Sequence, residues 1–106
     1  VATNNVLNPF TPFGDASLVR MANLYANVMQ LSRDDDIDQV FAMVSSRAAS
    51  IMGVDHQLRI GGPADIVILD ADDPCHAVRS SAPAIAGWKA GRRTFVRPQP
   101  IIFDPA

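Results

Sequence analysis

The chain has 106 residues, of which 48% are hydrophobic, and a formal net charge of −2 at pH 7. This length suffices for one small domain with one core, and the charge gives no sign of a nucleic-acid partner. Cys75 is the single cysteine, which excludes an internal disulfide and predicts a reducing, cytoplasmic compartment. No apolar run reaches the roughly 18 residues of a membrane span, so no membrane partner is expected.

The N-terminal segment predicts a loop followed by a long helix. The sequence opens on Val1 rather than methionine, and we expect it to be part of a longer protein. Residues 1–14 hold two prolines and three asparagines, which favour an irregular loop. Asp15 is the predicted N-cap of a helix from about Ala16 to Leu31.

The polar residues of this helix form one narrow stripe. The stripe consists of Arg20, Asn23, Asn27 and Gln30. Most other positions are apolar, which predicts a helix that is buried on most sides. The stripe is either a functional face that lines a cleft or the only solvated face, and the second interpretation is favoured.

A second helix is predicted from about Asp36 to Met52. Ile37, Val40 and other apolar residues recur on one face of it. Gly53 is suited to the position after its last turn. The acidic run 34–36 is typical of a helix N-terminus, and this explanation is simpler than a cation site.

The remaining half of the chain predicts strands. Ile66 to Leu69 are four consecutive aliphatic residues inside the segment 64–70, which predicts a strand covered on both faces. Pro74 opens a short helix, Cys75 to Ser80. Two further strands, Ala84 to Trp88 and Arg92 to Val96, flank a turn at Lys89–Gly91 and complete one small sheet.

These elements predict an α+β fold with two long helices and a small sheet. The character of the chain changes near residue 57, so we divide it into residues 1–57 and 58–106. The sequence holds two histidines, His56 and His76, and contains no HxH, HExxH or CxxC motif. No local metal site is therefore encoded.

Five segments, in this order, resemble cytosine-deaminase-like members of the amidohydrolase superfamily. Asn5 to Asp15 resembles the segment that follows the last barrel strand. The later segments are a helix carrying Met21 to Leu24, a helix ending in Ser46 to Gly53, the strand within Ile60 to Asp70, and the hairpin Trp88 to Arg92.

The resemblance implies a metal-dependent hydrolase on a (β/α)₈ barrel flanked by a small β-sandwich. Such enzymes hydrolyse C–N bonds in cyclic amides and amidines, with a divalent zinc or iron ion that activates water. A barrel needs about 250 residues. Residues 1–57 would then be the last barrel loop and two helices of a truncated barrel, and residues 58–106 part of the sandwich.

The resemblance also assigns roles to three residues. Asn4 occupies the position of the metal-binding and proton-accepting aspartate, Asn5 the adjacent substrate-side position, and Phe10 an aromatic near the pocket. An amide cannot take a proton from water, so Asn4 cannot act as the base. We expect no cofactor or metal on this chain itself.

Two classes of function remain open. The chain is a fragment of an amidohydrolase for a small heterocyclic substrate, inactive in isolation, or it is a non-catalytic structural or oligomerisation module. Its expected partner is a second copy of itself in a symmetric dimer that buries the first helix, or the missing barrel portion. An upstream reading frame that encodes HxH favours the first class, and a start codon near Val1 favours the second.

Overall fold

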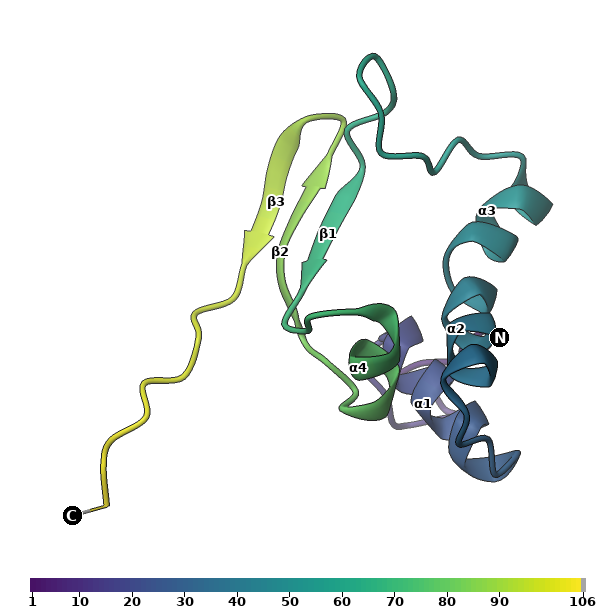
Figure 1. Ribbon diagram of the computed structural model, residues 1–106, viewed down its shortest axis with the longest axis vertical. Coiled ribbons are helices and arrows are strands. Elements are labelled where there is room, and N and C mark those ends of the chain that lie inside the picture. The colour runs from purple at the N-terminus through teal and green to yellow at the C-terminus, as the bar shows by residue number, and fades with distance from the viewer. Residues whose placement is uncertain (106) are drawn as a thin grey trace.

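Four helices and one three-stranded antiparallel sheet form residues 1–105, the part of the chain that the computed structural model describes (Figure 1). The predicted α+β class is confirmed. In chain order the elements are α1 (Leu18–Val28), α2 (Asp34–Met43), α3 (Ser46–Met52), β1 (Ile66–Leu69), α4 (Pro74–Arg79), β2 (Ala84–Lys89) and β3 (Arg92–Val96).

Helix α1 is shorter than predicted at both ends. Ser17, not Asp15, is the N-cap, and its hydroxyl accepts a hydrogen bond of 3.2 Å from the backbone N–H of Arg20. At the other end Gln30 adopts a left-handed conformation with φ 54°. The N–H groups of Gln30 and Leu31 then donate to the carbonyls of Asn27 and Ala26, a pattern that closes the helix before Leu31.

The prediction of one continuous second helix is wrong. The chain leaves helical geometry at Ser45, with φ −133° and ψ −99°, and restarts as α3. The Ser45 hydroxyl donates a hydrogen bond of 2.8 Å to the carbonyl of Phe41, an alternative to the helical backbone ladder. Helix α2 also begins at Asp34 rather than Asp36, which places all three acids in its first turn. Gly53 ends α3 with φ 65°, as predicted.

The core lies where α1, α2 and α4 meet. Its buried residues are Ala22, Ala26, Ile37, Val40 and Val78. Because α4 follows residue 57 and yet supplies Val78, the core contains residues from both predicted parts, 1–57 and 58–106. That division itself stays a prediction.

The polar stripe on α1 is not simply a solvated face. The side-chain amide of Asn23 donates hydrogen bonds to the carbonyls of Val78 (2.8 Å) and Arg79 (3.3 Å) at the end of α4. The favoured interpretation is therefore wrong at Asn23, which binds another element, while Arg20, Asn27 and Gln30 are exposed.

The three predicted strands form one sheet in the order β1-β2-β3, which confirms the expected hairpin. Ala90 and Gly91 at its turn have φ 49° and 76°. The prediction that β1 is covered on both faces is wrong for this chain. Val67 is 58% exposed and Ile68 is 44% exposed, and because neighbouring residues point to opposite faces, both faces of β1 lack cover.

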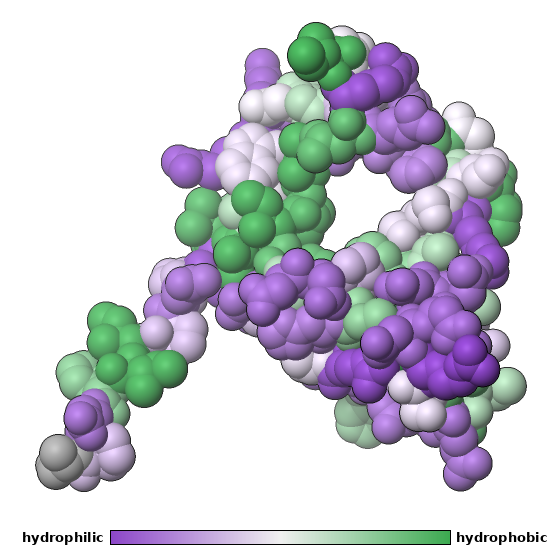
Figure 2. Space-filling model, in the orientation of Figure 1, coloured by the Kyte–Doolittle hydropathy of each residue, from purple (hydrophilic) through white to green (hydrophobic). Residues whose placement is uncertain are grey.

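The chain exposes more surface than a protein of its size normally does. Its accessible surface is 8129 Å², whereas a folded monomer of 11.4 kDa exposes about 5,800 Å². The radius of gyration is 15.4 Å, against about 13 Å for a compact domain of this length. Figure 2 shows an opening between the sheet and the helices, and an apolar C-terminal segment that extends away from the body.

Among residues 1–105, no helix is long and apolar enough to cross a membrane.

Candidate functional site

The N-terminal loop is organised around the side chain of Asn8. Its Oδ1 accepts hydrogen bonds of 3.0 Å from the backbone N–H groups of both Phe10 and Thr11. The Asn8 backbone N–H donates to the Thr11 carbonyl at 3.1 Å. Pro9 has a fixed φ and no N–H to donate, so Asn8-Pro9 initiates a tight turn.

The other end of the Asn8 amide reaches Asn5. Asn8 Nδ2 donates a hydrogen bond of 3.0 Å to Asn5 Oδ1, and both side chains are partly buried. The loop closes further through the N–H of Leu7, which donates to the carbonyl of Phe13 at 3.3 Å. Asn8 therefore joins the turn to the predicted substrate-side residue.

A depression of about 400 Å³ lies between this loop and α1. It combines two neutral amides, an acidic and a basic side chain, and apolar walls. Its lining includes Asn4, Asn5, Phe13, Asp15, Arg20 and Leu24. The Asp15 carboxylate and the Arg20 guanidinium lie 3.6 Å apart. Its volume and mixed lining suit a small polar molecule with an apolar face.

The structure brings two of the three predicted site residues together. Asn4 and Asn5 both line the depression, and Asn4 has a left-handed φ of 38°, which asparagine tolerates better than most residues. Phe10 is 89% exposed and lies outside the lining, where Phe13 supplies the aromatic ring. The roles of Asn4, Asn5 and Phe10 stay predictions.

The side chains at the depression do not fit the zinc or iron ion that the resemblance implies. Such sites are built from imidazole, thiolate and carboxylate ligands. Here the donors are the two amides and Asp15, which already accepts from the Ser17 N–H and faces Arg20. Within residues 1–105, no group of three or more His, Cys, Asp or Glu side chains is placed to hold a metal ion.

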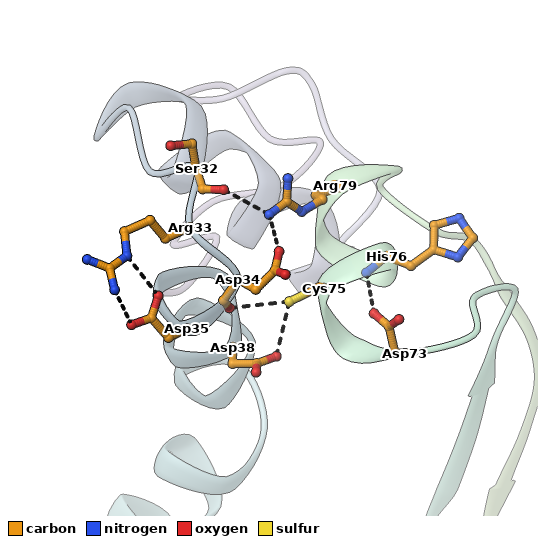
Figure 3. A network of polar contacts seen from close by, with 9 residues as sticks. All are labelled: Ser32, Arg33, Asp34, Asp35, Asp38, Asp73, Cys75, His76 and Arg79. Atoms are coloured by element: carbon orange, nitrogen blue, oxygen red, sulfur yellow. Dashed lines mark hydrogen bonds and ion pairs between the residues drawn. The ribbon is translucent and has the colours of Figure 1, made fainter.

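The single cysteine of the sequence lies in another group of polar side chains, where α4 meets α2 (Figure 3). Cys75 Sγ lies 3.2 Å from Asp38 Oδ1 and 3.3 Å from the Asp34 carbonyl oxygen, and its single S–H can donate to either of these acceptors. Burial and the neighbouring Asp38 carboxylate raise the pKa of the Cys75 thiol. The thiol therefore stays protonated at neutral pH and is not an activated nucleophile.

The same contact region is held by Arg79. Its guanidinium binds the Asp34 carboxylate at 2.6 Å and the Ser32 carbonyl at 2.9 Å. Asp73 caps α4, because its Oδ1 accepts a hydrogen bond of 2.7 Å from the backbone N–H of His76. These contacts attach α4 to the start of α2 and indicate a structural role.

Sequence reasoning missed three side chains of the depression and its loop. It treats Asn8 only as a turn former and Asp15 only as a helix N-cap, and for the stripe that contains Arg20 it favours a solvated face over one that lines a cleft. The signal for Asn8 is present, because an asparagine before proline with a threonine three positions later is typical of a side-chain-stabilised turn. No local pattern indicates that Asp15 and Arg20 face the same depression.

The chain is similar in sequence to known proteins over most of its length. Residues 2–95 match the model of the amidohydrolase family. The chain is 26% identical over 93 residues to N-isopropylammelide isopropyl amidohydrolase of Pseudomonas sp. (strain ADP), and the match covers 86% of this chain and 23% of that protein.

Two solved structures share the fold. They are crystal structures of a 5-methylcytosine deaminase from Klebsiella pneumoniae, one liganded with phosphonocytosine and one with 5-fluorocytosine. Their TM-scores are 0.80 and 0.81, with 24% sequence identity, and the matches cover 94% and 95% of this chain. The chain spans about a quarter of the length of these relatives. The family match covers most of the chain, and the chain belongs to the amidohydrolase family.

Proposed function

We propose that the chain is the C-terminal portion of a metal-dependent amidohydrolase that hydrolyses C–N bonds of cyclic amides or amidines, in the manner of cytosine deaminases. The observation that carries this proposal is the family match over residues 2–95, which contains both the loop of the candidate site and the sheet. The likeness to a 5-methylcytosine deaminase with 5-fluorocytosine bound supports a small heterocycle as the substrate class.

In this proposal the two parts of the chain have different origins. Residues 1–57 supply the last barrel loop and the helices after it, and residues 58–106 supply part of a β-sandwich. The exposed faces of β1 support this, because in a sandwich a second sheet would cover one of them. We propose that the whole protein acts in the cytoplasm, in line with the single cysteine of this chain.

The proposed contribution of this chain to the site is a polar wall. Asn5 faces the substrate, and Asn4 stands where the family's aspartate would accept a proton. An amide accepts hydrogen bonds but is not basic enough to deprotonate water. Side chains outside this chain would therefore hold the zinc or iron ion and accept the proton, and the chain alone would be inactive.

The test has two arms. The purified chain, supplied with zinc or iron, is incubated with cytosine and 5-fluorocytosine, and released ammonia is measured; we expect none above the protein-free control. The genomic DNA upstream of Val1 is then read and the whole reading frame expressed; we expect an HxH motif and hydrolysis. Ammonia release by the isolated chain, or an authentic start codon near Val1, would overturn the proposal.

A second candidate is a non-catalytic assembly module that forms a symmetric homodimer. The observation that favours it is the exposed apolar face of α1. Leu24 is 52% exposed, Val28 is 71% exposed and Met29 is 53% exposed. The whole chain, including its extended C-terminal segment, exposes about 2,300 Å² more than normal, and this area is comparable with what each partner buries in a large obligate interface. We propose a second copy of the chain as the occupant of this face when the chain is alone.

A further inference from the structure

We infer that Asn8 fixes the orientation of the Asn5 side-chain amide, so that Asn5 presents hydrogen-bond donors, and the depression takes a ligand that carries an acceptor. The inference rests on the proposed function only for the existence of a ligand there. The orientation itself follows from three hydrogen bonds that are independent of any ligand.

The first step concerns Asn8, whose two ends have different partners. Its Oδ1 accepts from the N–H groups of Phe10 and Thr11, and backbone N–H groups can only donate. The oxygen end of the Asn8 amide must therefore face the turn. The Nδ2 end then faces away from the turn, where Asn5 lies.

The second step concerns the orientation of the Asn5 side-chain amide, which follows from that of Asn8. Because Asn8 offers a donor, Asn5 must offer its acceptor, and Asn5 Oδ1 lies 3.0 Å from Asn8 Nδ2. The two donor hydrogens on Asn5 Nδ2 have no acceptor among the described residues, while Asn5 lines the depression. Since no buried side-chain nitrogen or oxygen of the described residues lacks a partner, Asn5 Nδ2 is open to solvent, and a ligand that supplies an oxygen or a ring nitrogen can replace water as its acceptor.

Asn4 provides a contrast within the same depression. It lines the depression beside Asn5, but no side-chain hydrogen bond within residues 1–105 fixes which end of its amide faces inward. Asn5 is thus the residue with a defined polarity. Asn8 is a positioning residue, since it does not line the depression itself and acts through Asn5.

Replacement of Asn8 by aspartate reverses the polarity while it keeps the turn. The new carboxylate would still accept from Phe10 and Thr11, but its second oxygen cannot donate to Asn5 Oδ1. Asn5 should rotate its amide, donate to this carboxylate and turn Oδ1 toward the depression. The variant Asn8→Asp thus changes one property of Asn5 without removing a side chain.

The primary readout is nitrogen-15 NMR of the asparagine side-chain amides in the 106-residue chain. In the unmodified chain we expect the Asn8 amide protons to exchange with water about fivefold more slowly than those of Asn5, the effect of one ordinary hydrogen bond. In Asn8→Asp the Asn5 protons should become the protected ones. Asn4→Asp adds the same charge to the depression and should leave the Asn5 protons unprotected.

Two further outcomes keep the test decisive. If the Phe10 and Thr11 amide signals are lost in Asn8→Asp, the turn itself has changed. The variant Asn5→Asp is then used to test the inference. It keeps an acceptor opposite Asn8, so retained protection of the Asn8 protons supports the inference and loss of protection overturns it. With the turn intact, an Asn5 amide that stays unprotected in Asn8→Asp also overturns it.

The ligand arm uses 1-methyl-2-pyridone, which has a carbonyl acceptor and no N–H or O–H donor. It should shift the Asn5 amide resonances of the unmodified chain and bind at least several-fold more weakly to Asn8→Asp. Equal binding to both would overturn the assigned polarity. Absence of binding to the unmodified chain would overturn the ligand part of the inference. The proton-exchange measurement does not depend on a ligand or on the proposed function, so it would still test the orientation of Asn5.

Discussion

The side-chain amide of Asn23 donates a hydrogen bond of 2.8 Å to the backbone carbonyl of Val78, 55 residues further along the chain. The same amide reaches the Arg79 carbonyl at 3.3 Å. Both carbonyls lie at the end of α4, where the helical ladder supplies fewer donors, and the Val78 carbonyl also accepts from the backbone N–H of Ser81 at 3.2 Å. One side chain of α1 thus supports the end of a helix from the other half of the chain, next to the buried Val78.

Removal of this amide should destabilise the fold. We expect Asn23→Ala to lower the free energy of unfolding by about 1–2 kcal/mol, because two hydrogen bonds between α1 and the end of α4 are lost, although the Val78 carbonyl keeps its bond from Ser81. Asn23→Asp should be worse, since a carboxylate would face the same carbonyl oxygens. Urea unfolding followed by circular dichroism measures both. Ser50→Ala removes an exposed polar side chain of α3 and is the control, with an expected loss below about 0.5 kcal/mol, whereas Asn27 is unsuitable because its amide donates to Asn23 Oδ1.

The element types followed from the sequence, whereas their boundaries depended on contacts that the sequence does not display. Apolar spacing and turn residues predicted the helices and the hairpin. The break at Ser45 depended on whether its hydroxyl would bond back to the Phe41 carbonyl. The early end of α1 depended on a left-handed Gln30, a conformation usually associated with glycine.

That left-handed Gln30 offers a stabilising substitution. Gln30→Gly should raise the free energy of unfolding by roughly 0.5–1 kcal/mol, because glycine adopts a positive φ without strain from a Cβ atom. Thermal unfolding measures the gain. Gln39→Gly is the matched control inside α2, where the same change should destabilise by about 1 kcal/mol. A loss of stability in Gln30→Gly would contradict the assigned backbone conformation.

Gly87 and Phe95 form a second pair with a specific steric relationship. They are opposite each other in β2 and β3, and a Cβ atom on Gly87 would overlap the Phe95 ring, with Cδ1 and Cζ at 3.0 Å. Gly87→Ala should therefore displace the ring and cost about 1–2 kcal/mol. Phe95→Leu removes the ring edge, and the double variant should recover part of the loss. Additive losses in this double-mutant cycle would show that the two residues do not interact.

The hairpin turn should carry a dependence on acidic pH. Asp65 Oδ1 accepts from the Ala90 N–H at 2.8 Å, and its carboxylate pairs with Lys89. The Lys89 contact and then the Ala90 hydrogen bond lower the pKa of Asp65. The unfolded chain therefore binds a proton more readily, and the stabilising effect is present above about pH 4 and lost as pH falls through the lower folded value.

The variant Asp65→Asn keeps an acceptor for Ala90 and removes the titration. Its unfolding midpoint should change less than that of the parent chain between about pH 5 and pH 2. Asp70→Asn, a nearby exposed acid, is the control and should keep the parent's pH dependence. Identical pH profiles for the parent chain and Asp65→Asn would contradict this role of Asp65.

The candidate site was only partly accessible to sequence reasoning. Resemblance located Asn4 and Asn5, because their positions follow a recognisable motif. It did not locate the Asp15–Arg20 pair, whose two members lie on either side of the Ser17 N-cap and both line the depression. It also selected Phe10, whereas the loop geometry set by Asn8 places Phe13 at the depression.

The last prediction concerns association through α1. Burial of apolar surface contributes about 25 cal/mol per Å². Covering the exposed face of α1 would therefore contribute several kcal/mol, a large share of the free energy of unfolding of a small domain. We expect the isolated chain to sediment as a dimer at micromolar concentration. Leu24→Glu with Val28→Glu should convert it to a folded monomer, because two buried carboxylates would face each other across a two-fold axis.

The control for this variant is Ile60→Glu. Ile60 is fully exposed in the loop between α3 and β1, away from α1, so the new charge there should leave the dimer intact. A well-folded monomer of the unmodified chain would rule out the dimer and leave the remainder of an amidohydrolase as the partner that covers α1. Equal dissociation by both variants would show that the interface is not the α1 face but another of the apolar surfaces.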